Sequence, residues 1–330
     1  TNILESIYVG TIGKSHRTND TSDMLMFNAE EAGIVVKFEK KDTPQKVNIK
    51  LFRQGPKDIR LNDTKISQKE LIGTLNTVIF CPEDLQLIKG TPSGRRRFLD
   101  MEISQTSATY YHQLMQYNRL LQQRNAILKE YRGKQNIPLE EWDLQLADMA
   151  SFIVKKRLES LKKINLLIDL MNRKLTGGLE NLTIGYEQPY MDNGSLEYTK
   201  EGFYERIKAA LPQDRHRMTT SVGPHRDDLR FFSDAMDLKK FGSQGQQRTA
   251  VLSLKLSELE FIKSEVGEYP VLLLDDVLSE LDESRRANLL QFIHKRIQTF
   301  ITTTDIHDFK DLKSVQFISC EGGKVQYGQP

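Results

Sequence analysis

Val271-Leu272-Leu273-Leu274-Asp275-Asp276 decides the fold, because four apolar residues run directly into two carboxylates. A short apolar run bounded by polar residues is typical of a strand that is buried on both faces of a parallel sheet. The acids then lie at the carboxyl end of the strand, where open α/β sheets bind ligands. The pattern is that of a Walker B strand, in which Asp275 would hold Mg²⁺ beside nucleotide phosphates. Taken alone, an ordinary buried strand with an acidic end explains the stretch equally well.

Two further motifs flank this strand. Phe241-Gly-Ser-Gln-Gly-Gln-Gln-Arg-Thr249 precedes it and opens an apolar helical pattern. Small and amide side chains at a helix start expose backbone N–H groups, which makes an anion site. Its place matches the signature of ABC-type ATPases, which caps the γ-phosphate of a nucleotide held by a second subunit. Leu278-Ser-Glu-Leu-Asp282 follows the strand where the D-loop of these ATPases lies. For that motif alone, a turn with a helix N-cap is the better interpretation.

The phosphate-binding loop is the missing part. A P-loop reads G-x-x-x-x-G-K-[ST]. Gly13-Lys14-Ser15 resembles its end, but Tyr8 occupies the place of the first glycine, and no strand is predicted directly before it. We interpret Thr1-Asn-Ile-Leu-Glu-Ser-Ile7 instead as a Walker A Thr with the helix that follows. The P-loop Lys and its glycines are then expected upstream of Thr1, and the 330 residues without them should bind nucleotide weakly and be inactive as an ATPase.

The remaining patterns predict an α/β protein with a helical lobe. Alternating or β-branched runs predict strands at 33–38, 47–52, 77–80 and 299–304. A helix is predicted from Thr91, with Pro92 at its first position, and long helices follow within 110–121 and 144–175. We therefore expect an N-terminal part of an ATPase head at 1–105, a helical lobe at 106–215 and the C-terminal part of the head at 216–330.

Composition excludes several classes of protein. The chain has 47 Lys plus Arg against 45 Asp plus Glu, which rules out a histone-like polycation but not a local basic patch. Cys81 and Cys320 form no metal-binding spacing and no disulfide framework, which fits a reducing compartment. We find no apolar run of the roughly 20 residues that a membrane span needs and no signal peptide.

Together the motifs resemble the RecF family of bacterial recombination mediators, which are ABC/SMC-type ATPases. The resemblance covers essentially the whole chain. Besides the stretches quoted above, it is carried by Gly13-Lys-Ser-His-Arg-Thr18, Phe80-Cys-Pro-Glu-Asp-Leu85, Arg96-Arg-Phe-Leu-Asp100, Gln123-Arg-Asn125 and Gly223-Pro-His-Arg-Asp-Asp-Leu229.

The resemblance implies an ABC/SMC-type P-loop ATPase head, with a mixed sheet and helices, plus an α-helical second lobe. It implies ATP and Mg²⁺ as cofactors, slow hydrolysis, a homodimer that forms with ATP, and binding to duplex DNA and single-strand gap junctions. It further implies loading of RecA with RecR and RecO in the bacterial cytoplasm. The alternatives are another ABC/SMC-type ATPase head, or a non-hydrolysing DNA-binding or protein-interaction module.

The resemblance also assigns roles to individual residues. Asp276 takes the place of the carboxylate that polarises the attacking water; Asp is one methylene shorter than the usual Glu, which fits slow turnover. Thr1 and Asp275 are the expected Mg²⁺ ligands. No His directly follows the 299–304 strand in the place of a switch His; His307 comes three residues late, so Thr304 or Asp305 is expected to substitute. The residues expected to bind nucleotide are Thr1, Asn2, Ser243, Gln244, Gly245, Gln246, Arg248, Asp275 and Thr304.

DNA contacts are expected from local basic clusters that neutralise phosphates. For each cluster, a solvated helix face is the simpler interpretation. The Arg226, Asp227 and Asp228 side chains of the Gly223–Asp228 motif could form a structural ion-pair network or contact nucleotide or DNA. The candidate DNA-binding residues are Lys14, Arg17, Arg95, Arg96, Arg97, Lys155 and Lys156.

Overall fold

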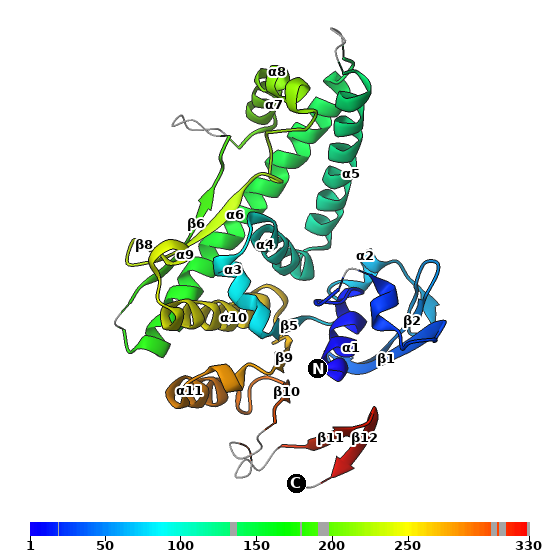
Figure 1. Cartoon of the computed structure of the whole chain (residues 1–330), viewed down its shortest axis with the longest axis vertical. Coiled ribbons are helices and arrows are strands. Elements are labelled where there is room, and N and C mark those ends of the chain that lie inside the picture. Colours follow the sequence, from blue (N-terminus) through cyan, green and yellow to red (C-terminus); the bar gives the residue numbers. More distant parts are fainter. Residues whose placement is uncertain are drawn as a thin grey trace.

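A parallel sheet lies at the centre of the computed structural model, which describes residues 1–18, 20–132, 137–178, 180–190, 198–304, 309 and 315–328 (Figure 1). Its strands are β5 (Thr77–Phe80), β9 (Val271–Asp275) and β10 (Thr299–Thr302), in the order β10-β9-β5. Asp275 lies opposite Thr302, and Leu274 lies opposite Phe80, so the three carboxyl ends meet at one edge. The predicted parallel sheet is confirmed, although the strand expected at 299–304 ends at Thr302.

Two helices cover the faces of this sheet. On one face, Ile79 and Leu273 pack against Leu4 of α1 (Asn2–Ile12). The alternate residues of the same strands, among them Val78 and Leu274, join the large core that includes the apolar side chains of α10 (Gln244–Val266). Because neighbouring residues of a strand point to opposite faces, the sheet is buried on both sides, as the apolar run predicted.

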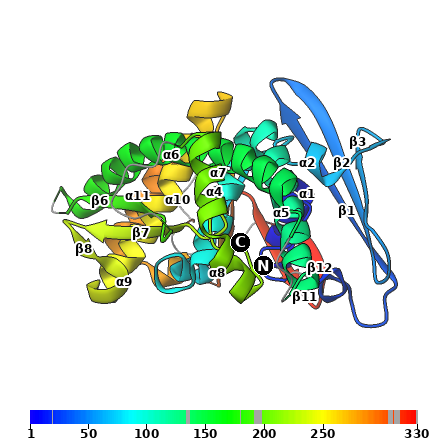
Figure 2. The same cartoon turned by 90° about the horizontal axis from the view of Figure 1, so that it is seen from above.

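The N-terminal sheet packs beside α1. It has the order β1-β2-β3-β4 and consists of β1 (Glu31–Lys40), β2 (Thr43–Phe52), β3 (Asp58–Leu61) and β4 (Thr64–Lys65). The predicted strands at 33–38 and 47–52 are thus confirmed. Gly10 allows close approach between helix and sheet, because a Cβ there would lie 2.4 Å from Cγ2 of Val36. Figure 2 shows this sheet at one end of the molecule.

Long helices form the upper part of the molecule in Figure 1. They are α4 (Pro92–Thr106), α5 (Ala108–Glu130) and α6 (Glu140–Thr176), with the shorter α7 (Lys200–Ala209) and α8 (Leu211–Arg217) at the tip. The helices predicted from Thr91, within 110–121 and within 144–175 are all present. Helix α6 ends where the sequence predicted, because Gly177 adopts the left-handed conformation, with φ of 69°, and caps it.

A third sheet connects the helical lobe to the segment before α10. Strand β6 (Leu182–Glu187) pairs with β7 (Asp228–Ser233), which pairs with β8 (Met236–Asp237), and α9 (Leu238–Phe241) follows. The lobe boundary that we place between residues 215 and 216 therefore separates two strands of one sheet. The boundaries themselves remain a prediction.

Shorter elements complete the described part of the chain. No helix within it combines the length and apolar character that spanning a bilayer requires. The shorter elements are η1 (Thr21–Met24), α2 (Gln68–Leu71), η2 (Pro82–Leu85), α3 (Gln86–Lys89), η3 (Leu278–Glu280), α11 (Glu283–Ile293), β11 (Phe317–Glu321) and β12 (Lys324–Gly328).

Candidate nucleotide site

The carboxyl edge of the central sheet gathers two hydroxyls on one carboxylate. Thr1 Oγ1 donates to Asp275 Oδ1 at 2.9 Å, and Thr302 Oγ1 donates to the same oxygen at 2.8 Å. Thr1 is the N-cap residue of α1, yet its hydroxyl does not cap the helix. It turns instead toward the Walker B acid, which is 7% exposed. Thr1 and Asp275 therefore lie close together, as expected.

The second acid occupies a different environment. Asp276 is exposed and adopts the left-handed conformation, with φ of 55°, which Asp tolerates better than most residues. Its N–H donates to Thr302 Oγ1 at 2.9 Å, and its carbonyl accepts from Ser279 Oγ at 2.9 Å. These bonds turn the chain sharply after Asp275. One carboxylate is consequently held inside the site, and the next faces solvent.

Thr302 is the functional candidate that the sequence reasoning missed. We expected Thr304 or Asp305 after this strand, but Thr304 lies in an exposed bend. Thr302, two residues earlier, contacts both acids of the Walker B pair. Strand register could have identified it, since the last residue of β10 lies opposite the last residue of β9. Asp305 and His307 lie outside the described residues.

The signature motif opens α10 as predicted. Ser243 is the N-cap, and its Oγ accepts from the N–H of Gln246 at 3.2 Å. Gln246 Oε1 in turn accepts from the N–H of Ser243 at 3.0 Å, which completes a capping box. Ser243, Gln244 and Gly245 are all exposed. The motif thus presents a helix N-terminus to solvent, as a contact with a second subunit would require.

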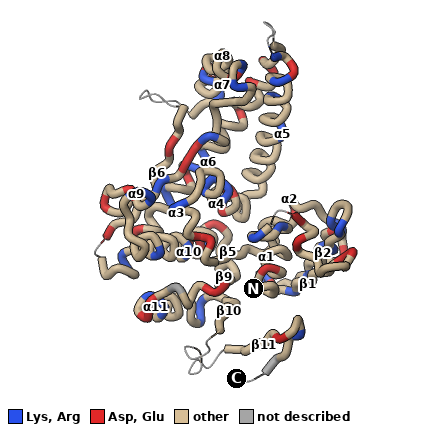
Figure 3. The backbone as a smooth tube through the Cα atoms, viewed as in Figure 1, with Lys and Arg blue, Asp and Glu red and all other residues tan. Residues whose placement is uncertain are grey.

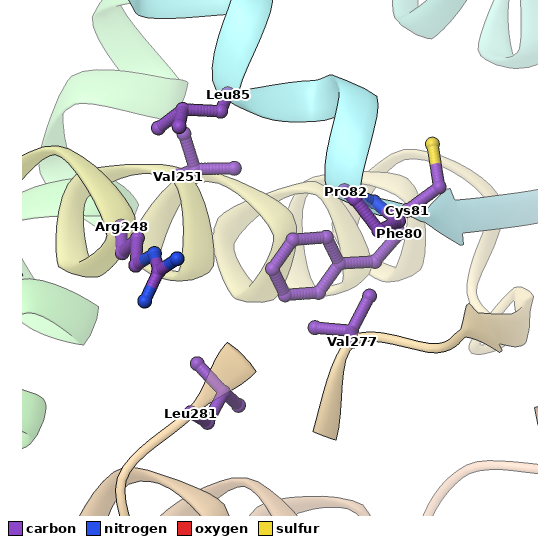
Figure 4. Close-up of a pocket in the computed structure, with 8 residues that line it drawn as sticks. All are labelled: Phe80, Cys81, Pro82, Leu85, Arg248, Val251, Val277 and Leu281. Atoms are coloured by element: carbon purple, nitrogen blue, oxygen red, sulfur yellow. The ribbon is translucent and has the colours of Figure 1, made fainter. Parts of the chain in front are cut away.

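A small pocket lies between α10 and the segment after β9 (Figure 4). Arg248 extends from α10 toward Leu281 and Val277, while Phe80 and Pro82 approach from the end of β5. The pocket therefore joins the signature helix, the segment assigned to the D-loop and the carboxyl edge of the sheet. Its lining residues are Phe80, Cys81, Pro82, Leu85, Arg248, Val251, Val277 and Leu281.

The end of the D-loop motif begins a helix. Asp282 is the N-cap of α11, and its Oδ1 accepts from the N–H of Arg285 at 2.9 Å. The structural interpretation of this turn is confirmed. Contact of this segment with a second subunit stays a prediction.

Gly13-Lys14-Ser15 does not form a P-loop, because it follows α1 and not a strand. Gly13 caps the end of that helix with φ of 75°. Ser15 Oγ donates to Glu5 Oε1 at 2.5 Å and accepts from the N–H of Arg17 at 2.9 Å, so the loop folds back along α1. Burial lowers the pKa of His16, although the carboxylates of Glu5 and Asp275 oppose this shift. The loop therefore lies near the Walker B acid.

A buried charge cluster lies behind the sheet edge. Lys255 of α10 pairs with Asp84 at 3.2 Å and with Glu258 at 3.3 Å. Burial opposes the charge of Lys255, but the surrounding carboxylates raise its pKa. Burial also raises the pKa of Glu102 to about 7 and that of Glu258 well above its usual value. We name Lys255, Asp84, Glu258 and Glu102 the Lys255 cluster; it joins the end of β5 to the signature helix.

The Gly223–Asp228 motif has a structural role. Arg95 binds both carboxylate oxygens of Asp228, at 2.7 and 2.8 Å. Asp227 is buried, lies 3.5 Å from Arg157 and accepts a hydrogen bond from the Tyr186 hydroxyl. Asp227 and Asp228 therefore join an ion-pair network with arginines of α4 and α6, which ties these helices to the start of β7. Arg226, which we had considered as a member of this network, instead donates to the carbonyl oxygen of Thr220.

The same motif contains a close backbone approach. Gly223 has φ of 129°, and a Cβ there would lie 2.3 Å from the hydroxyl of Tyr117. That hydroxyl lies 2.6 Å from His225 Nδ1, and His225 Nε2 lies 3.0 Å from the carbonyl oxygen of Thr220. Burial lowers the pKa of His225 to about 4. A neutral imidazole therefore bridges α5 and the segment before β7.

The candidate DNA-binding residues come from three separate segments, which are the loop after α1, helix α4 and helix α6. Arg95 is 3% exposed and bound to Asp228, so the prediction that it contacts DNA is wrong. Its place in a run of three arginines concealed the fact that one face of α4 is buried. Arg96 is half-buried and donates to the carbonyl oxygen of Asp227 at 2.7 Å, whereas Arg97 is exposed.

The other basic candidates lie on the surface. Lys14 is exposed, and Arg17 lies 3.5 Å from Glu5. Lys155 is exposed on α6, and Lys156 pairs with Glu159 at 2.7 Å. These positions leave the side chains accessible from solvent.

The oxygens at the sheet edge suit a hard cation. Hydroxyl and carboxylate oxygens are the donors that Mg²⁺ prefers, and Mg²⁺ usually takes one or two carboxylates together with substrate phosphates. In the described residues, no group of three or more His, Cys, Asp or Glu side chains is placed to hold a metal ion. Thr1 and Asp275 thus fit a Mg²⁺ that is completed by a nucleotide and water.

A parallel sheet with a Walker B acid, a Walker A-type helix and a capped signature helix defines an ATPase head of the ABC/SMC class. Solved structures of Smc heads have the same fold: one, from Pyrococcus furiosus, has a TM-score of 0.52 at 15% identity, over 99% of this chain and 86% of the other. A second Smc head, bound to the winged-helix domain of ScpA, has a TM-score of 0.55 at 14% identity.

The chain belongs to the RecF family. The DNA replication and repair protein RecF of Alkaliphilus oremlandii is 46% identical over 316 residues, which are 95% of this chain and 86% of the relative. RecF of Clostridium botulinum strain Okra is 42% identical over 99% of this chain and 90% of its own length. A solved structure of the recombination mediator RecF with ATP has a TM-score of 0.91 at 34% identity, covering 99% and 88%. No family model matches the chain.

Proposed function

We propose that the chain is the ATP-dependent DNA-binding head of a RecF-type repair protein, which dimerises when it binds ATP. The hydroxyls of Thr1 and Thr302 on Asp275 are the observation that carries this proposal. They support a metal-binding role for Thr1 and Asp275 at the carboxyl edge of the parallel sheet, where phosphates bind in this class of protein. The likeness to RecF solved with ATP supports the choice of ATP.

Each residue of the site has a separate proposed role. Thr1 and Asp275 would hold Mg²⁺, and Asn2, the first residue of α1, lies where a phosphate meets the helix N-terminus. Thr302 holds Asp275 in place and turns Asp276 outward. Asp276 would orient the water that attacks the γ-phosphate, and its short side chain fits slow hydrolysis. ATP itself supplies the phosphate oxygens that complete the metal site.

A second copy of the chain completes the nucleotide site in this proposal. The signature residues Ser243, Gln244 and Gly245 are exposed at the start of α10, so they are free to meet a phosphate from outside. Gln246 supports Ser243 through the capping box, and Arg248 extends from the next turn of the helix. Thr304, in the exposed bend after β10, completes the set of proposed nucleotide contacts.

Binding to DNA is proposed to follow dimerisation. The remaining candidates for phosphate contacts are Lys14, Arg17, Arg97, Lys155 and Lys156. Arg96 can reach DNA only if it breaks its hydrogen bond to the carbonyl oxygen of Asp227. We further propose duplex and gapped DNA as ligands, RecR, RecO and RecA as partners in loading RecA, and the cytoplasm as the location. The names of the solved RecF structures place those proteins in the RecFOR pathway, which supports RecR and RecO as partners.

Dimerisation of the natural full-length protein tests the proposal. We expect ATP and Mg²⁺ to double the molar mass measured by light scattering, and Ser243→Arg to abolish this change. Ser67→Arg is the matched control, because Ser67 is also an exposed N-cap with a capping box, but on α2. A full-length protein that stays monomeric at saturating ATP would refute the proposal.

A further inference from the structure

A cavity of about 440 Å³ lies at the tip of the helical lobe, apart from the nucleotide site. The segment after β6, helices α7 and α8, and the segment before β7 form its walls. Its volume is within the roughly 300–1,000 Å³ that is typical of small-ligand sites. Figure 3 shows Lys and Arg on α7 and α8 in this region. We name it the three-arginine pocket, because Arg206, Arg217 and Arg226 line it.

Two of these guanidinium groups are held in place by the backbone. Arg226 donates to the carbonyl oxygen of Thr220 from Nε at 3.0 Å and from Nη2 at 2.7 Å. Arg206 Nη1 donates to the carbonyl oxygen of Tyr190 at 2.8 Å. Each bond fixes the arginine and leaves other N–H donors of the same group available. Fixed donors bind an anion with a smaller loss of side-chain entropy than free ones.

The positive charge of the pocket is not neutralised by the described part of the chain. No carboxylate lines the cavity, and none of the three arginines forms an ion pair with a described residue. Asp214, which follows the lining residue Gln213, has other partners: one carboxylate oxygen accepts from Arg124 at 2.7 Å, and the other accepts from the N–H of Ser221 at 2.9 Å. Three cations therefore share one concave surface, and the described residues provide no counterion for them.

The chemistry of the walls points to a phosphorylated ligand. Arginine forks match phosphate geometry, and three of them favour a group that carries more than one negative charge. Tyr190 and Pro189 add an aromatic and apolar wall, on which a planar base can stack. A cation at the end of α8 also interacts favourably with that helix dipole, but this explains only Arg217 and not the two arginines that come from α7 and from the segment before β7.

We propose that the three-arginine pocket binds a phosphate monoester of nucleotide size. The two possible sources are a free mononucleotide and the phosphorylated end of a nucleic-acid strand. This site is separate from the ATP site, so the inference stands or falls independently of the proposed function.

Binding of defined probes to the full-length protein tests this inference. The probes are AMP, a short single-stranded oligonucleotide with a 5′-phosphate, and the same oligonucleotide with a 5′-hydroxyl, each measured by calorimetry. We expect Arg217→Gln and Arg226→Gln each to weaken binding of the phosphorylated probe about tenfold, as the loss of one charge-assisted hydrogen bond implies. Lys208→Gln is the matched control, because Lys208 is exposed on α7 but does not line the pocket.

The outcomes separate the alternatives. Arginine-dependent binding of AMP supports a free nucleotide, and a preference for the 5′-phosphate over the 5′-hydroxyl supports a strand end. Equal binding of all probes by the wild type and both variants overturns the proposal. Arginine-dependent binding of an acidic peptide without phosphate binding overturns it as well. Arg217 is exposed, so its variant should fold even if that of Arg226 does not, and thermal unfolding of both variants provides the check on folding.

Discussion

Substituting Glu102 by Gln should change how the stability of this protein depends on pH. Glu102 is 5% exposed, and its Oε2 has no hydrogen-bond partner within the described residues. Burial raises its pKa from 4.5 to about 7, with Asp84 adding to the shift and Lys255 opposing it. The wild-type protein must therefore ionise a buried carboxyl group as the pH rises, whereas the amide of Glu102→Gln stays neutral.

The sign and size of the effect follow from proton linkage. Between about pH 4.5 and 7, the folded chain holds a proton on Glu102 that the unfolded chain has lost, so the free energy of unfolding falls as the pH rises. At about 1.4 kcal/mol for each pKa unit, Glu102 should lower the stability of the wild type by about 2–3 kcal/mol between about pH 5 and 8. Glu102→Gln should match the wild type near pH 5 and exceed it by this amount near pH 8.

Denaturant unfolding of wild type and variant at a series of pH values measures this difference directly. Titrating groups outside the Lys255 cluster contribute equally to both proteins and cancel in the comparison. Glu130→Gln serves as the control, since Glu130 is exposed at the end of α5 and should leave the pH profile unchanged. Parallel profiles for Glu102→Gln and the wild type would refute the reasoning, because they would mean that Glu102 is ionised throughout this range.

In the full-length protein, Thr302→Val should keep the fold but lower the single-turnover rate of ATP hydrolysis by about 10- to 100-fold, because it removes the hydrogen bond to Asp275, which is worth about 1.5–3 kcal/mol. An unchanged rate would show that Thr302 has no role in the site. Arg97→Gln should reduce the slope of log affinity for duplex DNA against log salt by about 1, as the loss of one phosphate contact requires. Arg95→Gln should instead destabilise the protein by about 3–5 kcal/mol, because it leaves Asp228 unpaired, and thermal unfolding would detect this. Equal stability of the Arg95 and Arg97 variants would contradict the assignment of Arg95 to the interior.

The sequence predicted the central elements well because their patterns are local. Strand β9 consists of Val271–Asp275, as expected, since an apolar run that ends in acids has few other folds available. Gly177 ends α6 because its left-handed backbone conformation caps the helix, which is also a local feature of the sequence. The place of the Walker B acid and of the signature N-cap could therefore be derived from composition and order alone.

The errors and omissions arose where the answer depends on distant residues. Arg95 and Arg97 look alike in the sequence, and only Asp228 of β7 determines that Arg95 is buried. Thr302 could be chosen over Thr304 only from the register between β10 and β9. Lys255 stands in an apolar helix, and nothing near it predicts that Asp84 and Glu102 come to surround it. Contacts between residues that are distant in the sequence therefore determine the roles of Arg95, Thr302 and Lys255.

The length of helix α6 determines how movement at one proposed site is transmitted to the other. Its 37 residues span about 55 Å at about 1.5 Å per residue, from the tip of the lobe to the signature helix α10, against which it packs. No described proline or glycine interrupts it, so it acts as a stiff lever. A tilt of about 5° at the α10 end would displace the opposite end by about 5 Å over this length. Small movements at the ATPase head are thus enlarged at the tip, where the three-arginine pocket lies.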